Sequence, residues 1–195
     1  MLILFFFISY WRDGYLLQAD LDTLTTRLNA GDILREEIGT STGLIMQNGL
    51  PDANANVPDP GDASNQYWLV IHAIPGNKSV GITGTYTPLV YFKRYSLNAS
   101  GQYIMNGTQP YEDEYVLYLD GSGKSLKQRS IANPNATGDK LKTSCPTSLA
   151  SPSCPADKTI ADDLASIDMR YFSRTGNLID YTSIYDPAII PPLKW

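Results

Sequence analysis

The chain opens with apolar residues only. The run from Met1 to Trp11 carries no charge, and the first charged residue is Arg12. As a helix this run would be about 16 Å long, too short to cross a hydrocarbon core of about 30 Å by itself. Two interpretations follow. Either the run is a core strand or buried helix that starts a soluble domain, or it is the distal half of a membrane helix whose first half is missing.

The residues after Arg12 favour the second interpretation. Leucines recur at helical spacing, with polar residues between them, at Leu17, Leu21, Leu24 and Leu28. Gly39 suits the end of a helix, because glycine adopts the left-handed conformation of a C-cap without strain. The pattern predicts a helix over residues 1–39, apolar and then amphipathic, which anchors the chain in a membrane or filament core and is truncated at its start.

After Gly39 the helical period ends and short strands alternate with turns. A loop rich in Pro, Asn and Asp covers residues 50–66. Apolar runs predict strands at 43–49, 67–74, 88–97, 114–120 and 125–131, and tyrosine-rich hairpins at 115–130 and 168–183. The sequence therefore predicts an α+β fold, in which the long N-terminal helix packs on a head of half-buried antiparallel strands over residues 40–195.

Composition narrows the function classes. Net charge is −5 and only 18% of the residues are charged. Nucleic-acid binding needs clustered Lys and Arg that neutralise phosphates, so nucleic acid is not an expected partner. The one basic cluster is Lys124, Lys127 and Arg129, on the hairpin 115–130. We interpret it as a solvated strand face.

Two cysteines lie close together in a polar segment. Cys145 and Cys154 are each followed by proline. We expect a disulfide, which would close a short loop and favours an extracytoplasmic address. The alternatives are two unpaired thiols or half a metal site, although zinc would need two more ligands and the only histidine is His72.

Two stretches imitate binding motifs. "DGSGKS" at 120–125 suggests a phosphate loop, but Tyr118 stands where the first glycine of that motif is required, so a hairpin turn is the better interpretation. Oxygen-bearing side chains recur in the Pro-rich loop as in a calcium loop, but Val57 and Ala63 replace its glycine and glutamate. We interpret them as a solvated turn; they are Asp52, Asn54, Asn56, Asp59 and Asp62.

No catalytic constellation is visible. His72 lies within an apolar strand pattern, and neither G-x-S-x-G nor H-E-x-x-H occurs. The sequence therefore predicts no catalytic, cofactor-binding or metal-binding residue and no cofactor. A hydrolase whose site is assembled only in three dimensions is a third-ranked alternative.

The order of segments resembles one family. An apolar start leads into "DLDTLTTRLNAGDILREEIGTSTGLI", a Pro-rich loop follows, and then come "LVYFKRYSL", "EYVLYLDGSGKSLKQRS" and the late hairpin "SIDMRYFSRTGNLIDYTS". This order is similar to type IV pilin-like proteins, in particular the J-type minor pseudopilins of type II secretion and the W-type minor pilins. The basic leader, glycine cleavage site and fifth-position glutamate of prepilins are absent, so no processing or assembly residue carries over.

The resemblance implies a structural role without catalysis. The chain would be a subunit of a type IV pilus or a type II secretion pseudopilus, assembled through its N-terminal helix, with other pilins or pseudopilins and the membrane as partners. Its expected location is the inner membrane with a periplasmic or extracellular head, and the pilus or pseudopilus after assembly. The alternative is a secreted or surface-anchored β-rich adhesive or binding domain.

Overall fold

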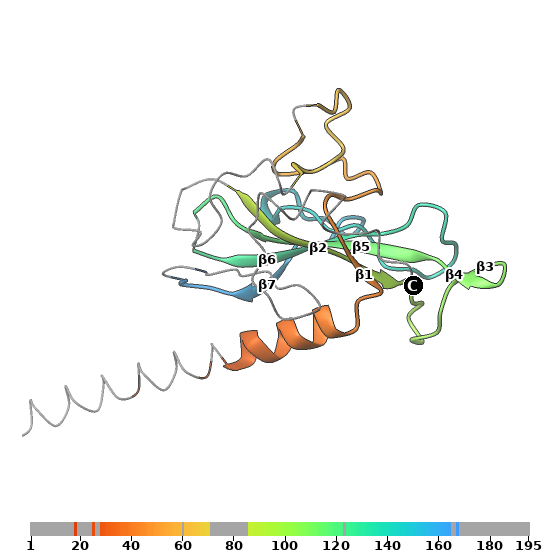
Figure 1. Cartoon of the computed structure of the whole chain (residues 1–195), viewed down its shortest axis with the longest axis horizontal. Coiled ribbons are helices and arrows are strands. Elements are labelled where there is room, and N and C mark those ends of the chain that lie inside the picture. Colours follow the sequence, from red (N-terminus) through yellow and green to blue (C-terminus); the bar gives the residue numbers. More distant parts are fainter. Residues whose placement is uncertain are drawn as a thin grey trace, which may run out of the picture. The chain divides into compact units, whose positions relative to one another are not determined.

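The computed structural model describes residues 18, 25, 28–59, 61–70, 86–122, 124–164 and 167. The chain divides into two units, Met1–Gly39 and Thr40–Trp195, which are described separately. Figure 1 shows the described helix and the strands of the second unit. The predicted hairpin 168–183, the apolar run 1–11 and His72 lie outside the described residues.

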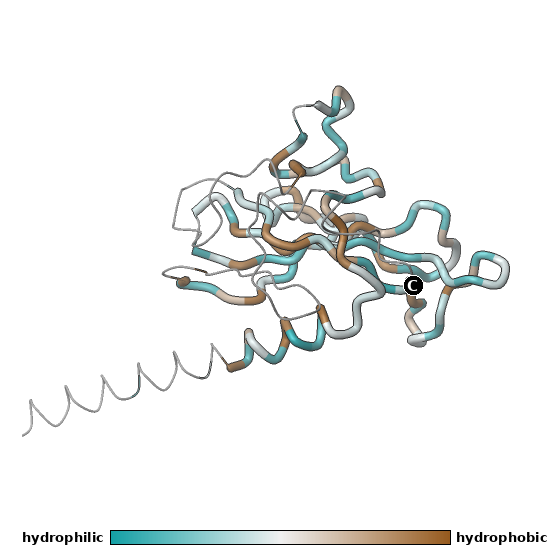
Figure 2. The backbone as a smooth tube through the Cα atoms, viewed as in Figure 1, coloured by the Kyte–Doolittle hydropathy of each residue, from teal (hydrophilic) through white to brown (hydrophobic). Residues whose placement is uncertain are grey.

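In the first unit, a helix is described over residues 28–39. Its side chains are exposed or half-buried; Leu28 is 60% exposed, and Asp32 pairs with Arg35 one turn later at 3.6 Å on the surface. Figure 2 shows polar and apolar positions alternating along it. A pair of this kind adds only about 0.3–0.5 kcal/mol.

The prediction of an α+β fold built on a long N-terminal helix, residues 1–39, is wrong. The described residues contain the helix at 28–39 and are otherwise mostly β, with a five-stranded antiparallel sheet. The leucine spacing was assigned to a helix that packs on the sheet. Within the second unit, the Pro-rich loop and the residues that follow it to Trp68 cover one face of the sheet, and Trp68 enters the core.

The predicted inner-membrane location is also corrected. Among the helices that the structure describes, none is long and apolar enough to cross a bilayer, so an inner-membrane anchor through an N-terminal helix has no support. The helix at 28–39 contains both acidic and basic side chains, including Asp32 and Arg35. Charged groups are costly in the hydrocarbon region.

The main sheet of the second unit has the order β1-β2-β5-β6-β7, with every neighbouring pair antiparallel. Its strands are β1 (Gly43–Ile45), β2 (Thr87–Tyr95), β5 (Glu112–Leu119), β6 (Leu126–Ile131) and β7 (Lys158–Ala161). A small second sheet pairs β3 (Met105–Asn106) with β4 (Gln109–Pro110), and a 3₁₀ turn, η2, covers Thr147–Leu149.

The predicted hairpin 115–130 is confirmed. Tyr115 lies opposite Ser130, and the pairing continues to Leu119 opposite Leu126. Strands β2, β5 and β6 match the predicted strands at 88–97, 114–120 and 125–131 within a few residues. Of the predicted strand 67–74, the described part forms only a single bridge, from Trp68 to Pro58.

Strand β2 is buried on both faces, not on one as predicted. Tyr91 is 1% exposed and Phe92, which points to the opposite face, is 0% exposed. Phe92 stacks on Tyr115 of β5, with ring centroids 5.1 Å apart. Figure 2 shows that hydrophobic residues gather along the central strands of the β unit. The run of apolar residues in β2 is thus the pattern of a doubly covered strand.

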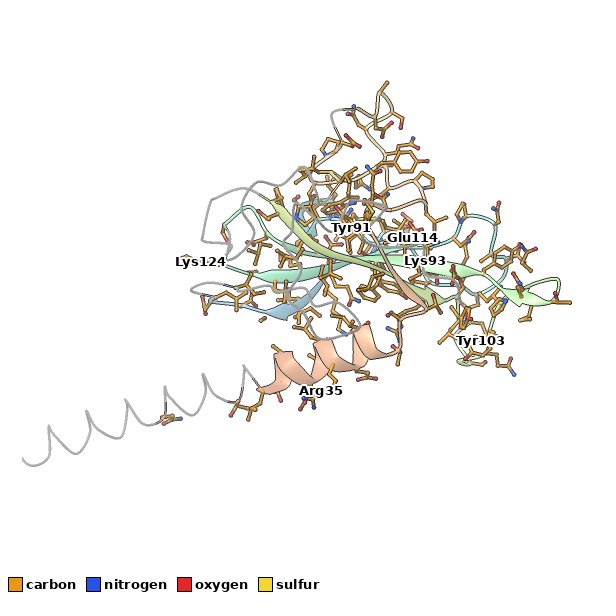
Figure 3. All side chains as sticks on the ribbon, in the orientation of Figure 1. Arg35, Tyr91, Lys93, Tyr103, Glu114 and Lys124 are labelled. Atoms are coloured by element: carbon orange, nitrogen blue, oxygen red, sulfur yellow. A yellow bond between two sulfur atoms is a disulfide. The ribbon has the colours of Figure 1, made fainter. Side chains whose placement is uncertain are left out.

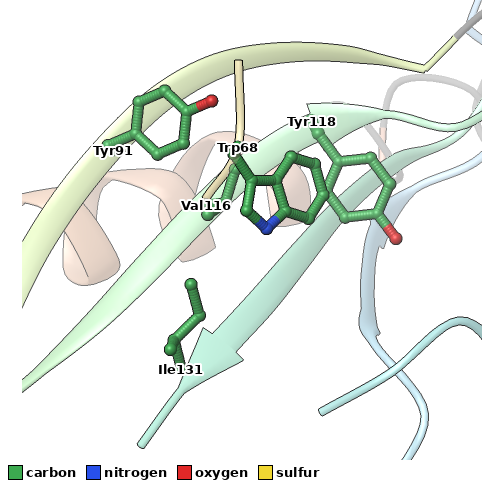
Figure 4. Close-up of a cluster of buried hydrophobic side chains, with 5 residues drawn as sticks. All are labelled: Trp68, Tyr91, Val116, Tyr118 and Ile131. Carbon is green, nitrogen blue, oxygen red and sulfur yellow. The ribbon is translucent and has the colours of Figure 1, made fainter. Parts of the chain in front are cut away.

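The core lies between the sheet and the Pro-rich loop. It consists of Trp68, Tyr91, Val116, Tyr118 and Ile131 (Figure 4). The rings of Trp68 and Tyr118 lie 5.2 Å apart at a tilt of 51°. Tilted aromatic pairs at such distances add about 0.5–1.5 kcal/mol beyond the area they bury.

Buried polar side chains hold the loop on the sheet. Asn48 accepts a hydrogen bond from the backbone N–H of Trp68 at 2.8 Å. Oε2 of Glu114, on β5, accepts the backbone N–H groups of Gly49 and Leu50 at 2.6 and 2.8 Å. Lys93 of β2 lies 3.7 Å from the same carboxylate, and Figure 3 shows the two side chains together. The loop is therefore a fixed layer of the fold.

Candidate functional site

The most unusual polar feature is an arginine with no solvent exposure. Arg129, on β6, donates from Nε and Nη2 to the two carboxylate oxygens of Asp157, at 2.6 and 2.9 Å. Its Nη1 donates to Oδ2 of Asp52 at 2.8 Å. Both Arg129 and Asp52 are 0% exposed, and Asp157 is 6% exposed. We call Arg129, Asp52 and Asp157 the arginine clasp.

Each member of the arginine clasp comes from a different part of the second unit. Arg129 lies opposite Val116 in the sheet, and therefore on the face that carries the core. Asp52 belongs to the Pro-rich loop, where its N–H donates to the carbonyl of Gln66. Asp157 follows the cysteine loop, and its N–H donates to the carbonyl of Cys145 at 2.9 Å.

Neutral donors occupy the remaining acceptor positions. Asp157 also accepts the hydroxyls of Tyr118, at 2.5 Å, and Ser144, at 2.6 Å. Asp52 accepts the indole N–H of Trp68 at 2.7 Å. With four donors, Asp157 uses roughly all the lone-pair positions that a carboxylate offers.

Electrostatics in the clasp favour the charged arginine. Burial acts to lower the pKa of Arg129, but the hydrogen bonds with Asp157 and the charge of Asp52 outweigh it, so the pKa is raised. Burial and the hydrogen bond to Asp157 both raise the pKa of the Tyr118 phenol. The indole of Trp68 lies 5.4 Å from the guanidinium carbon, a cation–π distance.

The arginine clasp is built to hold segments together. Its charged atoms are enclosed and already bonded, so a substrate would have to displace these partners to reach them. Breaking such a buried pair by removing one partner costs about 3–5 kcal/mol, because a charge is left uncompensated. The clasp joins the Pro-rich loop, β6 and the cysteine loop into one body.

The predicted disulfide between Cys145 and Cys154 is confirmed. The Cα atoms of the two cysteines lie 5.8 Å apart, and Cys145 is 1% exposed. The backbone of Cys145 bonds to the segment beyond Cys154 twice, through its N–H to the Pro155 carbonyl and its carbonyl to the Asp157 N–H. The disulfide therefore closes the loop that presents Asp157 to Arg129.

Arg129 was missed by sequence reasoning. The interpretation of Lys124, Lys127 and Arg129 as a solvated strand face is wrong for Arg129, although Lys124 is exposed and Lys127 half-exposed. The register of the predicted hairpin could have indicated its burial, because a hairpin centred on residues 120–125 places Arg129 opposite Val116, on the core face. The sequence did not indicate that Asp52 and Asp157 would meet it.

The three carboxylates of the calcium-like pattern, Asp52, Asp59 and Asp62, are occupied by protein groups. Asp52 belongs to the clasp, so its interpretation as part of a solvated turn is wrong. Asp59 accepts the side-chain amide of Gln47 and the N–H of Gly61. Hydrogen bonds, the largest from the Ser64 hydroxyl, lower the pKa of Asp62 to about 2. No cluster of three metal-binding side chains is found among the described residues.

The stretch 120–125, which resembles a phosphate loop, forms a hairpin turn, as predicted. It connects β5 to β6, and Asp120 donates its N–H to the carbonyl of Ser125 at 3.0 Å. Oδ1 of Asp120 accepts the N–H and hydroxyl of Ser122 at 3.2 and 2.6 Å. The segment after the turn is a strand, so this loop does not lead into the helix that a phosphate loop requires.

A second candidate site is an exposed apolar surface beyond the end of β2. Four large side chains are 40–59% exposed there: Tyr95, Leu97, Tyr103 and Met105. The rings of Tyr95 and Tyr103 meet edge to face, 5.4 Å apart, and Leu97 bridges to Tyr103. We call these four residues the tyrosine patch. In Figure 3, Tyr103 lies at the end of the β unit opposite Lys124.

The tyrosine patch borders a hollow of about 350 Å³. Tyr95 and Leu97 line both, and other hollow-lining residues include Arg94, Asp113, Tyr115 and Lys140. The Arg94 guanidinium lies 5.7 Å from the Tyr115 ring centroid. Asp113 is only 2% exposed, and burial raises the pKa of its carboxyl above the usual 3.8. The patch and hollow combine aromatic, apolar and charged groups on one surface.

Comparison with protein-family models, curated proteins and solved structures found no match to this chain. The resemblance to pilin-like proteins therefore stays a prediction.

Proposed function

We propose that this chain is a structural subunit, and not an enzyme, whose β unit contacts neighbouring subunits through the tyrosine patch. The proposal rests on the tyrosine patch, which the fold leaves exposed at one end of the sheet. The patch consists of Tyr95, Leu97, Tyr103 and Met105. The sequence resemblance supplies the class of assembly: a type IV pilus or a type II secretion pseudopilus, in which this chain would be a minor component.

Physical chemistry supports a contact role for the patch. Tyrosine combines a large apolar ring with a hydroxyl, loses little conformational entropy on docking, and is enriched in interface hot spots. Tyr103 is 59% exposed, so most of its surface is available to a partner. The arginine clasp and the disulfide hold the sheet behind it in one arrangement, which reduces the ordering cost of binding.

The alternative is a β-rich adhesive or binding domain. The specific observation in its favour is the hollow beside the patch, whose volume of about 350 Å³ falls in the range of small-ligand sites. A ligand there would meet the rings of Tyr95 and Tyr115 and the charges of Arg94 and Asp113. Under this alternative the patch would be the rim of a ligand site.

Site-specific photo-crosslinking in the producing cells tests the proposal. A photoreactive phenylalanine replaces Tyr103 in the full chain, and the matched control carries it at Leu149, which is equally exposed, at 58%, in η2. We expect position 103, and not 149, to give a discrete adduct with a second copy or with another chain that has a pilin-type N-terminal sequence. Equal labelling at both positions, or no subunit adduct at 103, would contradict it.

A further inference from the structure

The dipeptide Asn–Gly occurs twice in the chain, in contrasting environments. Asn48–Gly49 lies between β1 and the Pro-rich loop, and Asn106–Gly107 lies at the tip of the β3–β4 hairpin. Asn48 is 3% exposed, whereas Asn106 is exposed. Asparagine is a chemically labile residue, and a following glycine leaves the attacking backbone nitrogen unhindered. The two dipeptides provide a comparison within one molecule.

We propose that Asn106 is a site of spontaneous deamidation that converts the hairpin tip from neutral to anionic. The backbone nitrogen of Gly107 loses its proton to solvent base and attacks Cγ of Asn106. The new C–N bond closes a cyclic imide, and the side-chain nitrogen leaves as ammonia. Water then adds to either imide carbonyl and opens the ring to aspartate or isoaspartate. Water is the only co-reactant, and no electrons are exchanged.

The geometry at Asn106 permits the attack. Outside its two chain neighbours, Gly107 has no atom within 4 Å of the position that a Cβ would occupy, so the turn is open to solvent and to the base that removes the amide proton. The Asn106 side chain makes no hydrogen bond to the described residues. Two residue pairs join β3 to β4, Met105–Pro110 and Asn106–Gln109, and the Tyr111 N–H extends the ladder by donating to the Ile104 carbonyl at 2.9 Å. Asn106–Gln109 is the last pair before the turn, and the exposed end of a short two-stranded ladder opens more readily than the interior of a sheet, which gives the backbone the freedom that ring closure needs.

Asn48 is protected by its hydrogen bonds. Its Oδ1 accepts the N–H of Trp68 at 2.8 Å, and its Nδ2 donates to the carbonyl of Leu50 at 2.6 Å. The N–H of Gly49, the nucleophile in this case, donates to Glu114 at 2.6 Å. Ring closure at Asn48 would first have to break all of these bonds in the interior of the protein.

The new charge would arise at the edge of the proposed contact surface, because Asn106 and Met105 are neighbours in β3 and point to opposite faces of that strand. Asn106 follows Met105, which belongs to the tyrosine patch and is 49% exposed. A carboxylate buried at an apolar interface without a partner is costly. Under the proposed function, a partner that covers the patch and the adjoining hairpin tip would meet this charge, so deamidation weakens docking as the protein ages, and the variant Asn106→Asp reproduces the aged state at once.

Peptide mapping of the incubated full chain tests the chemistry without any assumption about function. The folded protein is kept at mildly alkaline pH, and the gain of about 1 Da for each amide lost is followed at both dipeptides. We expect Asn106 to react at least about tenfold faster than Asn48, because Asn48 reacts only after local opening. In denaturant the two rates should become similar. Asn106→Gln should remove the product from this peptide.

One result would overturn the proposal: Asn106 deamidates no faster than Asn48 in the folded protein, although both react in denaturant. The functional consequence has its own readout. If Asn106 deamidates but the variant Asn106→Asp crosslinks from position 103 as the parent protein does, Asn106 is a modification site that does not affect docking.

Discussion

The arginine clasp and the tyrosine patch belong to the same β unit and treat their side chains in opposite ways. In the clasp, charged groups are enclosed; Arg129 is 0% exposed. In the patch, apolar groups are left open; Tyr103 is 59% exposed. Both arrangements are unfavourable for an isolated domain, because burying charge costs solvation and exposing apolar surface forgoes hydrophobic stabilisation. From this difference we infer that the clasp stabilises the fold and that the patch contacts a partner.

Replacing Arg129 should give the largest effect. Arg129→Met keeps an unbranched side chain, although a shorter one, and leaves Asp52 and Asp157 without their buried cation. We expect a loss of about 3–5 kcal/mol in the free energy of unfolding, measured by urea denaturation. The matched control is Lys127→Met on the same strand, which should change stability by no more than about 0.5 kcal/mol. Equal losses in both variants would show that the clasp does not stabilise the fold.

Removal of the disulfide ranks second. Changing both Cys145 and Cys154 to Ser should lower the unfolding free energy by about 2–3 kcal/mol, because the loop is no longer closed in the unfolded chain. The parent protein should lose the same amount when a reductant is added, and the double variant should not respond to it. If reductant destabilises both proteins equally, the disulfide is not the cause.

Asp113, beside the patch, should give a smaller and pH-dependent effect. Burial raises the pKa of its carboxyl above 3.8, so the folded state retains the proton to higher pH than the unfolded state. Its contribution is therefore greatest below pH 3.8 and is lost as pH rises through the folded pKa. Asp113→Asn should lack this dependence and gain stability relative to the parent protein as pH rises. A difference between parent and variant that stays constant across pH would refute the assignment.

The patch itself should give the smallest effect on stability. Tyr103→Ser removes a largely exposed ring, and we expect the unfolding free energy to change by no more than about 0.5 kcal/mol. The same variant should reduce crosslinking from a photoreactive group at Leu97. A stability loss comparable to that of Arg129→Met would mean that Tyr103 belongs to the core network, and the contrast between the two regions would fail.

Local patterns predicted the hairpin and missed the clasp, for a physical reason. The hairpin 115–130 is encoded by neighbouring residues: alternating strand residues on both sides of a glycine-containing turn, with Asp120 placed to bond within it. The disulfide was also a short-range inference, across nine positions. The clasp depends on register and on loops distant in sequence, which no local pattern reports.

The fold class was predicted wrongly because periodicity describes a face and not its partner. The spacing of Leu17, Leu21, Leu24 and Leu28 indicated an apolar stripe, but not what covers it. The sheet face carrying Val116 is instead covered by a polar-looking loop. The loop can do so because Trp68 supplies apolar area, while Asn48 bonds its backbone. Composition suggested solvent exposure for a segment that is part of the core.

The sequence distances within the clasp also set an order of events during synthesis. Arg129 lies 77 residues after Asp52 and 28 residues before Asp157. At translation rates of about 5–20 residues per second, Asp157 is added to the chain on the order of seconds after Arg129. A nascent chain in that interval can pair Arg129 with Asp52 only, and the β unit cannot close until the cysteine loop has left the ribosome. Chains that end between Ile131 and Asp157 should therefore lack a stably folded β unit.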